Sequence, residues 1–216
     1  MTEAQSTEAG RSRRLVVASL NRAKAGEIVR ILRDEGVGFE VASLAEFPGV
    51  ELPPETGSTF AANATAKAKH AAEMTGLPAI ADDSGLEVDA LGGEPGIRSA
   101  RFAGDGASDE DRYRKVLELM GEVADDCRSA RFRCAAAFAA PEGEVLLAEG
   151  KCEGRIAREP AGSGGFGYDP IFVPEDHACT MAQLSDAQKH AISHRGRALR
   201  RLARVLREHV GSSSSR

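Results

Sequence analysis

Apolar positions near the beginning of the chain change from a continuous run to a helical spacing. The run Leu15 to Ala18 ends in the polar segment Ser19 to Asn21, which predicts a short buried strand followed by a loop. Ile28, Ile31 and Leu32 then recur on one helical face, which is typical of an amphipathic helix. The pattern therefore predicts a strand, a loop and a helix in that order.

A second helix and a second strand are predicted next. Ser58 or Thr59 can cap the helix and Gly76 can end it, because glycine tolerates the left-handed backbone that closes many helices. The inward positions of this helix are Phe60, Ala64, Ala68, Ala71 and Ala72. Residues 79–81 predict a buried strand, and we expect the polar segment Asp82-Asp83-Ser84-Gly85 to lie in the loop after it.

The rest of the chain predicts a helix, a hairpin, a further strand and a final helix. Ser108 can cap the first of these helices, whose opening turn is acidic and so complements the helix dipole. Apolar segments 132–139 and 145–148 flank a Pro-Glu-Gly-Glu turn, which predicts the hairpin, and 151–157 continues the sheet. The final helix has Leu199, Leu202, Val205 and Leu206 facing inward, with the expected solvated charges Arg197, Arg200, Arg201, Arg204 and Arg207 on its other faces.

Both ends of the chain lack such periodicity. We expect residues 1–14 and 211–216 to be disordered tails and residues 15–210 to form a single domain, since no repeat or long linker divides them. Strands that alternate with helices, together with a hairpin, predict an α/β fold with a mixed sheet.

Composition narrows the classes of protein that the chain can belong to. It has 28 Lys+Arg and 33 Asp+Glu in 216 residues, a formal net charge of −5, which disfavours general nucleic-acid binding. No apolar run approaches the ~20 residues of a membrane span, and no signal segment opens the chain, so we expect a cytoplasmic protein without a membrane partner. The cysteines, Cys127, Cys134, Cys152 and Cys179, show no Cys-x-x-Cys spacing and are expected to be buried small hydrophobes.

Asp82 and Asp83 are the first candidates for chemistry, because open α/β sheets place ligands at the carboxyl ends of their strands. Adjacent aspartates cannot both point the same way. One can face a metal ion or water while the other accepts hydrogen bonds, and close approach raises the pKa of each. An ordinary solvated turn is the alternative.

A glycine-rich segment with two aromatic residues spans residues 162–170. Glycines let the backbone approach a ligand closely, and Phe166 and Tyr168 offer flat faces on which a base can stack. The segment lacks the Gly-Lys-Ser/Thr of a phosphate loop. The alternative is a flexible hairpin tip whose aromatic side chains belong to the core.

Several cations complete the pattern: Lys24, Lys67, Lys189, His194 and Arg195. Taken singly, each can be a solvated surface charge. Lys24 differs because it follows a loop at a helix start, where backbone amides can bind an anion. Cations for phosphate, carboxylates for a divalent ion and aromatic faces for a base together predict a nucleoside polyphosphate site.

The same residues resemble, in the same order, the motifs of the inosine triphosphate pyrophosphatase family, the dITP/XTP pyrophosphatases. The resemblance covers roughly residues 15–206. It rests on 19–24 (SLNRAK), 55–60 (ETGSTF) with Asn63 and Lys67, 81–86 (ADDSGL), 93–101 (GEPGIRSAR), 164–170 (GFGYDP with its preceding glycine) and 193–196 (SHRG).

This resemblance implies Mg²⁺-dependent hydrolysis of deaminated purine triphosphates, dITP, ITP and XTP, to the monophosphate and pyrophosphate. It implies one catalytic domain with a long mixed sheet flanked by helices, two lobes around a central nucleotide-binding cleft, and a homodimer. Asp83 would be the proton acceptor and a metal ligand. The substrate-binding residues would be Ser19, Asn21, Lys24, Ser84, Phe166, Gly167, Tyr168, Asp169, Lys189, His194 and Arg195.

The chain departs from the family pattern at one position that bears on the metal. Pro54 stands where many relatives have a metal-binding Glu, which leaves Glu55 as the candidate second ligand. Gln183 and Gln188 also replace frequent glutamates. Three other functions share some of these features: a pyrophosphatase for pyrimidine nucleotides, a phosphomonoesterase with an aspartyl nucleophile, and a nucleotide-binding module without catalysis.

Overall fold

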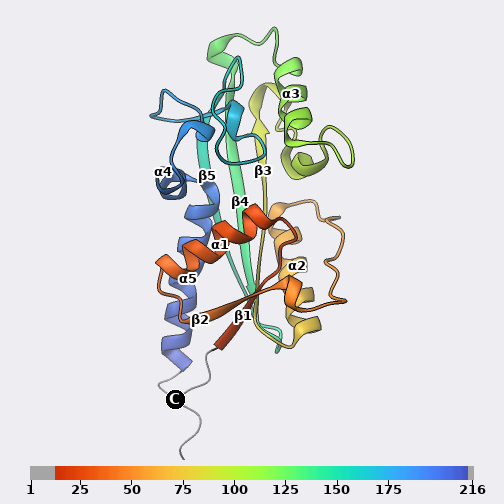
Figure 1. The fold of residues 1–216 in the computed structure, drawn as a ribbon, viewed down its shortest axis with the longest axis vertical. Helices are drawn as coiled ribbons and strands as arrows, with labels where there is room; N and C mark the ends of the chain where they lie inside the picture. Colours follow the sequence, from red (N-terminus) through yellow and green to blue (C-terminus); the bar gives the residue numbers. More distant parts are fainter. Residues whose placement is uncertain (1–12, 214–216) are drawn as a thin grey trace, which may run out of the picture.

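Six strands form one mixed sheet in the computed structural model, which describes residues 13–213 (Figure 1). Their order across the sheet is β2-β1-β3-β4-β5-β6. The strands are β1 (Arg13–Val17), β2 (Phe39–Ser43), β3 (Ala79–Val88), β4 (Ser129–Ala139), β5 (Val145–Ile156) and β6 (Phe172–Pro174). The pairs β1–β2 and β1–β3 are parallel, whereas β3–β4, β4–β5 and β5–β6 are antiparallel. The predicted mixed α/β sheet is confirmed.

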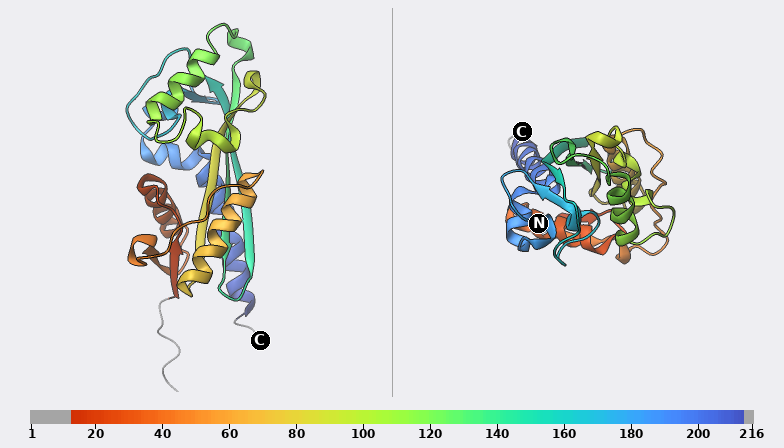
Figure 2. Two further views of the ribbon diagram at one scale, coloured as in Figure 1. Left: turned by 90° about the vertical axis from the view of Figure 1, so that its right-hand side faces the viewer. Right: turned by 90° about the horizontal axis from the view of Figure 1, so that it is seen from above.

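The long strands β3, β4 and β5 run along the long axis of the molecule and connect two lobes (Figure 1). The helices are α1 (Arg22–Asp34), α2 (Phe60–Thr75), α3 (Asp109–Leu119), α4 (Asp186–Ile192) and α5 (His194–Ser213). One lobe contains α1, α2 and the length of α5, while α3 lies at the other end of the strands (Figures 1 and 2). No helix within 13–213 is long and apolar enough to cross a membrane.

Two apolar layers cover the two faces of the sheet in the first lobe. On one face, Leu15 and Ile80 pack with apolar side chains of α1 and α5. On the other face, Val16 and Ala81 pack with the alanines of α2, whose small side chains let that helix lie close to the strands. The alternation of neighbours such as Leu15 and Val16 between faces follows from the period of two in a strand.

The second lobe has its own core around Phe132, Tyr168 and Phe172. Arg128 is buried beside it and holds the edge of this lobe together. Its guanidinium donates to the carbonyl oxygens of Met120, Ile156 and Ala157 at 2.6, 2.9 and 3.0 Å. These bonds join the end of α3 to the end of β5.

Local signals explain where the helices begin and end. Thr59 caps α2 by accepting a hydrogen bond from Ala62, and Gly76 ends that helix in the left-handed conformation. Ser108 caps α3 in a capping box with Asp111. The three predicted starts and stops at Thr59, Gly76 and Ser108 are therefore confirmed.

The segment Asp82 to Gly85 does not lie in a loop, contrary to the sequence expectation. It lies inside β3, where its backbone pairs with residues 133–136 of β4. Polar residues interrupt the apolar run there, but the long partner strand β4 satisfies the backbone and carries β3 onward. The sequence pattern also did not predict β2, β6 or α4.

The last helix differs from its prediction in two ways. Leu199, Leu202 and Leu206 are buried, but Val205 is 37% exposed. Four of its arginines, expected to be solvated, instead donate to backbone carbonyl oxygens of other segments. These are Arg197 to Lys151, Arg200 to His190, Arg201 to Glu149 and Arg207 to Glu35. Long side chains reach neighbouring carbonyls while their heads stay near solvent.

Other expectations need smaller corrections. Cys134 and Cys152 are buried as expected, but Cys127 is exposed and Cys179 is half-buried, because both lie outside the strands. β1 begins at Arg13, within the tail expected at 1–14, and α5 continues to Ser213. Residues 1–12 and 214–216 lie outside the described part of the chain.

Candidate active site

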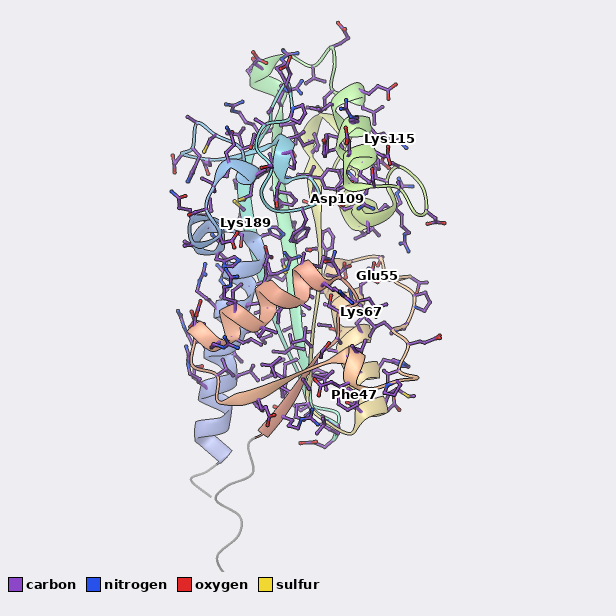
Figure 3. All side chains as sticks on the ribbon, in the orientation of Figure 1. Phe47, Glu55, Lys67, Asp109, Lys115 and Lys189 are labelled. Atoms are coloured by element: carbon purple, nitrogen blue, oxygen red, sulfur yellow. The ribbon has the colours of Figure 1, made fainter. Side chains whose placement is uncertain are left out.

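Two adjoining pockets occupy the region between the lobes. The first, of about 580 Å³, is lined by the glycine-rich segment, and the second, of about 980 Å³, by the Glu55 segment and β3. Asn21, Lys24, Ser84 and Ala100 line both, so the two are parts of one cleft. Every candidate site residue predicted from the sequence lines one pocket or the other. Figure 3 shows Glu55 and Lys67 on the lobe of α2, facing the lobe that carries Asp109.

Asp82 and Asp83 point to opposite faces of the sheet, as the period of a strand requires. Asp82 faces α5, where its Oδ2 accepts from Nε of Arg195 at 2.9 Å. Asp83 faces α2, where its Oδ2 accepts from Asn63 at 2.8 Å. The expectation that the two carboxylates have different partners is confirmed by this arrangement.

Asp83 is held in place by hydrogen bonds, and its surroundings raise its pKa. Asn63 fixes one carboxylate oxygen, while the backbone N–H of Ser84 donates to the other at 3.0 Å. Burial raises the pKa of Asp83; the Lys67 charge lowers it and the Glu55 charge raises it again. A buried carboxylate with a raised pKa is a better proton acceptor than an ordinary aspartate.

Glu55 and Asp83 share a single cation. Nζ of Lys67 lies 2.5 Å from Oε1 of Glu55 and 3.9 Å from Oδ1 of Asp83. Two carboxylates around one ammonium group leave a net negative charge at this point of the pocket. Both supply hard oxygen ligands of the kind that Mg²⁺ prefers, so the donor set fits that ion. No cluster of three or more His, Cys, Asp or Glu side chains suited to a metal occurs in 13–213, but Mg²⁺ commonly takes one or two carboxylates plus substrate phosphates.

Arg195 is the centre of a buried network between the pockets. It donates to Asp82 at 2.9 Å, to Glu27 at 2.6 Å and to Oγ of Ser84 at 2.8 Å. Although burial opposes the effect, the Arg195 charge holds the pKa of Asp82 well below its usual value. Glu27 also accepts from Lys189 at 2.9 Å, which joins α1 to α4 and α5.

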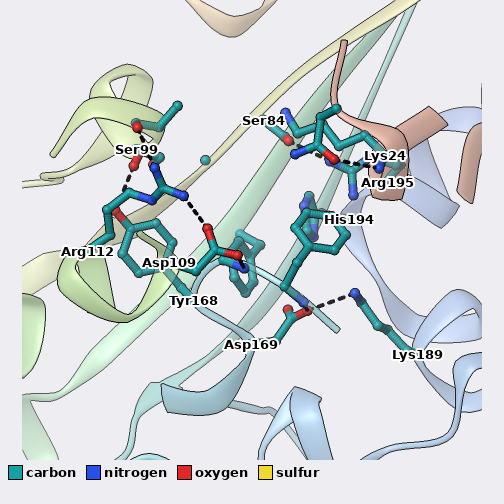
Figure 4. A pocket seen from close by; sticks show the side chains of 16 residues that line it. Lys24, Ser84, Ser99, Asp109, Arg112, Tyr168, Asp169, Lys189, His194 and Arg195 are labelled. Carbon is teal, nitrogen blue, oxygen red and sulfur yellow. Dashed lines mark hydrogen bonds and ion pairs between the residues drawn. The ribbon is translucent and has the colours of Figure 1, made fainter. Parts of the chain in front are cut away.

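The glycine-rich segment forms one wall of the first pocket (Figure 4). Asp169 accepts from the backbone N–H of Phe166 and from Lys189, at 2.9 and 2.8 Å. The Lys189 ammonium lies 4.5 Å from the centre of the Phe166 ring, a cation–π contact. Tyr168 is buried in the lobe core and donates its hydroxyl to the carbonyl of Ser99 at 2.8 Å. Phe166 is therefore the more accessible of the two aromatic side chains predicted to stack on a base.

His194 lies against Phe132 with parallel rings whose centres are 4.6 Å apart. Burial, with the neighbouring positive charges of Arg195 and Lys189, lowers the pKa of His194 well below its usual value, so the ring is neutral at pH 7. Its Nδ1 has no hydrogen-bond partner within the described residues. A neutral imidazole can act as donor on one nitrogen and acceptor on the other.

The backbone amides at the start of α1 were expected to bind an anion beside Lys24, but two of them already donate to Asn21. Oδ1 of Asn21 accepts from the backbone N–H groups of Ala23 and Lys24 at 3.0 and 3.1 Å, so these amides are already occupied. The Lys24 ammonium, which forms no ion pair within residues 13–213, is the group left for a phosphate. Ser19 lines the same pocket.

Most of the N–H groups that could donate to a base in the first pocket are also engaged elsewhere. Of the amides after Gly164, that of Phe166 donates to Asp169 and that of Gly167 donates to Asp109 at 2.7 Å. The Arg195 guanidinium donates to the carboxylates of Asp82 and Glu27 and to the hydroxyl of Ser84. His194 is the candidate that keeps an unpartnered polar atom, Nδ1.

Three residues that shape the pockets were given no site role from the sequence, although Asn63 belongs to a motif on which the family resemblance rests. Glu27 is three positions after Lys24 on α1, and this helical spacing was an available signal. Asn63 is one helical turn before Lys67 on α2. Asp109 was assigned only to the dipole of its helix, yet it lines the first pocket and pairs with Arg112; no local signal shows this role.

Comparison with known proteins gives one family. A model of the Ham1 family matches residues 15–205. A dITP/XTP pyrophosphatase of Desulforamulus reducens is 49% identical over 193 residues, 89% of this chain and 95% of that protein. A dITP/XTP pyrophosphatase of Vibrio cholerae is 49% identical over 199 residues, 91% of this chain and 98% of that protein.

Solved structures agree with the fold. A HAM1 protein from Coxiella burnetii superposes with a TM-score of 0.82 at 47% identity, covering 91% of this chain and 99% of that one. The Staphylococcus aureus Ham1 protein gives a TM-score of 0.80 at 41% identity, covering 91% of this chain and 100% of that one.

Proposed function

The chain belongs to the Ham1 family, and from this membership we propose that it is a nucleoside triphosphate pyrophosphohydrolase of deaminated purine nucleotides. Its substrates are dITP, ITP and XTP, each hydrolysed with one water to the nucleoside monophosphate and pyrophosphate. The observation that carries the proposal is that two pockets adjoin each other. One has an aromatic wall at Phe166, and the other has carboxylates and lysines around Asp83. This function removes deaminated nucleotides from the nucleotide pool.

We assign the first pocket to the nucleoside and the second to the phosphates and a metal ion. Phe166, Gly167, Tyr168 and Asp169 form the nucleoside wall, and Lys189, His194 and Arg195 complete the lining of this pocket. Figure 4 shows Tyr168, Asp169, Lys189, His194 and Arg195 around it. A base that stacks on an aromatic ring gains about 1–3 kcal/mol. Ser19, Asn21 and Lys24 follow toward the phosphates, and Ser84 lies where the pockets meet.

Mg²⁺ is the proposed cofactor, held by Asp83 and Glu55 together with substrate phosphates. When bound, the ion neutralises charge that develops on the phosphates. Glu55 thereby takes the place of the ligand that Pro54 does not provide. Lys67, which now neutralises both carboxylates, keeps them close together.

Asp83 is the proposed proton acceptor for the attacking water. Its Oδ2 is fixed by Asn63, and its raised pKa suits a base that works near neutral pH. A water in line with the leaving pyrophosphate attacks the α-phosphorus, the bond from that phosphorus to the bridging oxygen breaks, and the water proton passes to Asp83.

Lys24 stabilises the charge of the leaving pyrophosphate. Lys189 does not share this role, because its ammonium is neutralised by Glu27 and Asp169 in the nucleoside pocket. We therefore assign Lys189 to the orientation of Asp169 and Phe166 instead.

A panel of dITP, ITP, XTP, GTP, ATP and dTTP tests the proposal, with separate detection of pyrophosphate and orthophosphate and with Mg²⁺ or a chelator present. Pyrophosphate release from ITP and XTP that requires Mg²⁺ is the expected result. Orthophosphate release would indicate a phosphomonoesterase, preference for dTTP a pyrimidine enzyme, and binding without turnover a nucleotide-binding module. Any of these three outcomes contradicts the proposal.

Two further properties belong to the proposal. We propose a homodimer, on the basis of family resemblance, and light scattering at micromolar concentration should give twice the chain mass. We also propose a cytoplasmic location, because the four free cysteines suit a reducing compartment, and cell fractionation tests it.

A further inference from the structure

The phosphate pocket contains more positive charge than its ion pairs use. Lys24, Lys67 and Arg101 line it. Lys67 is shared by Glu55 and Asp83, and the pocket carboxylate Asp82 is paired with Arg195. Within residues 13–213, Lys24 and Arg101 form no ion pair, so these two cations are available to an anionic ligand.

Arg101 has most of its hydrogen-bonding capacity unused. Its Nη2 donates to the backbone carbonyl of Glu55 at 3.2 Å, and no other hydrogen bond from its guanidinium is formed within the described part of the chain. A guanidinium carries five N–H donors in a planar fork. The side chain is exposed at the pocket, so the remaining donors can reach a ligand.

The segment that carries Arg101 is firmly fixed. Arg101 is the last residue of a short 3₁₀ helix, Gly96–Arg101. Oγ of Ser99 accepts from the backbone of Leu86 at 2.9 Å and donates to the carbonyl of Gly96 at 2.6 Å. A Cβ on Gly85 would clash with this same carbonyl, so glycine at that position lets the helix pack directly on β3.

The order of the two cations along the cleft indicates which phosphates Arg101 can reach. Lys24 lines both pockets, whereas Arg101 lines only the second. A nucleotide whose base occupies the first pocket has its α-phosphate nearest the junction. Its β- and γ-phosphates then extend into the second pocket, beyond Lys24 and toward Arg101.

We propose that Arg101 binds the terminal phosphates of the substrate and the pyrophosphate that leaves, an inference that rests on the proposed function. A guanidinium fork matches two phosphate oxygens, which a lysine cannot do. Because Arg101 also holds the carbonyl of Glu55, one side chain connects the leaving group with the segment that carries the proposed metal ligand.

Direct titration of magnesium pyrophosphate into the protein tests this role without requiring turnover. The variants are Arg101→Ala and the milder Arg101→Gln, which preserves a hydrogen-bond donor if the alanine variant does not fold. Arg98→Ala is the matched control, since Arg98 lies on the same 3₁₀ helix, pairs with Glu94 and lines neither pocket. IMP, the other product, is titrated in parallel.

We expect Arg101→Ala to weaken pyrophosphate binding at least about tenfold, as for the loss of charged hydrogen bonds, with IMP binding unchanged within about twofold. Arg101→Gln should bind pyrophosphate more weakly than the unmodified protein and more tightly than Arg101→Ala. Arg98→Ala should bind both products as the unmodified protein does. Unchanged pyrophosphate binding by both Arg101 variants would overturn the inference. An equal loss of IMP binding would overturn it too, because it would indicate a general collapse of the site. Absence of ITP hydrolysis by the unmodified protein would instead contradict the proposed function.

Discussion

Arg195 and Asp82 form a buried ion pair between α5 and β3, with Nε and Oδ2 2.9 Å apart, although the residues are 113 positions apart in the chain. The contact places the Ser-His-Arg segment against the back of the strand that carries Asp83 on its other face. Because Asp82 and Asp83 are adjacent on β3, any shift of α5 also changes the position of the proposed base.

Replacing Asp82 with alanine should therefore cost stability as well as activity. Removing one partner of a buried pair commonly costs 3–5 kcal/mol, and we expect about 3 kcal/mol because Glu27 still neutralises Arg195. Urea unfolding monitored by circular dichroism measures the change. The matched control is Glu35→Gln, which breaks an exposed pair with Arg207 and should cost less than about 1 kcal/mol. Equal costs for the two variants would contradict the importance of the buried pair.

A substitution at Asp83 should separate catalysis from folding. Asp83→Asn keeps the shape and the hydrogen bond from Asn63, but an amide is a poor base and a weak Mg²⁺ ligand. We expect kcat for ITP to fall by about 10²–10⁴, with an unchanged far-UV circular dichroism spectrum.

Glu87→Gln is the control for that experiment, because Glu87 lies on the same strand and contacts Arg131 and Arg133 outside both nucleotide pockets. Its kcat should match that of the unmodified protein. If Asp83→Asn keeps a kcat within about tenfold, the assignment of the base is wrong.

The sequence predicted elements whose signals are local. The caps at Thr59 and Ser108 and the left-handed Gly76 each depend on residues within one helical turn, so the starts or ends of α2 and α3 follow from composition and spacing. α4 has seven residues and β6 has three, too few for a periodic pattern, and these elements were not predicted.

Long-range contacts account for what the sequence could not predict in the site. The polar segment at Asp82 continues a strand because β4 pairs with it, and β4 is more than forty positions away. The candidate site residues line the pockets, but the sequence did not predict their hydrogen-bond and ion-pair partners. The Arg195 guanidinium, for instance, is occupied by Glu27 and Asp82, which no spacing in the sequence indicates.

His194 should make stability depend on pH. Its pKa in the folded protein is well below 6.5, whereas in the unfolded chain it is about 6.5. Below about pH 6.5 the unfolded chain therefore binds a proton that the folded protein does not, and stability falls by up to about 1.4 kcal/mol per pH unit. Urea unfolding from about pH 8 to about pH 5 measures this contribution.

The matched comparison is His194→Asn, which cannot titrate. The stability advantage of the unmodified protein over this variant should be constant above about pH 7 and shrink as the pH falls below about 6.5. A difference that stays constant or grows on acidification would show that His194 is not buried in its neutral form.

The last prediction concerns the choice of base. Hypoxanthine and xanthine present an acceptor at O6 and a donor at N1, while adenine presents the reverse at both positions. A site built to pair with O6 leaves its own groups unpaired against ATP, which supports discrimination of about 10⁴. Guanine shares O6 and N1–H, so its rejection depends on the 2-amino group and should be weaker. We expect kcat/KM to be higher for ITP or XTP than for GTP. The excess over kcat/KM for ATP should be larger still.

Two variants locate the source of this preference. Arg195 lines the nucleoside pocket, and its bonds to Asp82, Glu27 and Ser84 use three of its five N–H groups. If the remaining groups read the base, Arg195→Ala should narrow the ratio of kcat/KM for ITP to that for ATP. Arg197→Ala is the control, since Arg197 lies two positions along the same helix, donates to the carbonyl of Lys151 and lines neither pocket. The ratio, rather than the absolute rate, is the informative quantity, because we expect loss of the Asp82 pair to lower the rates for both nucleotides. Comparable turnover of ATP and ITP by the unmodified protein would contradict the whole scheme of base recognition.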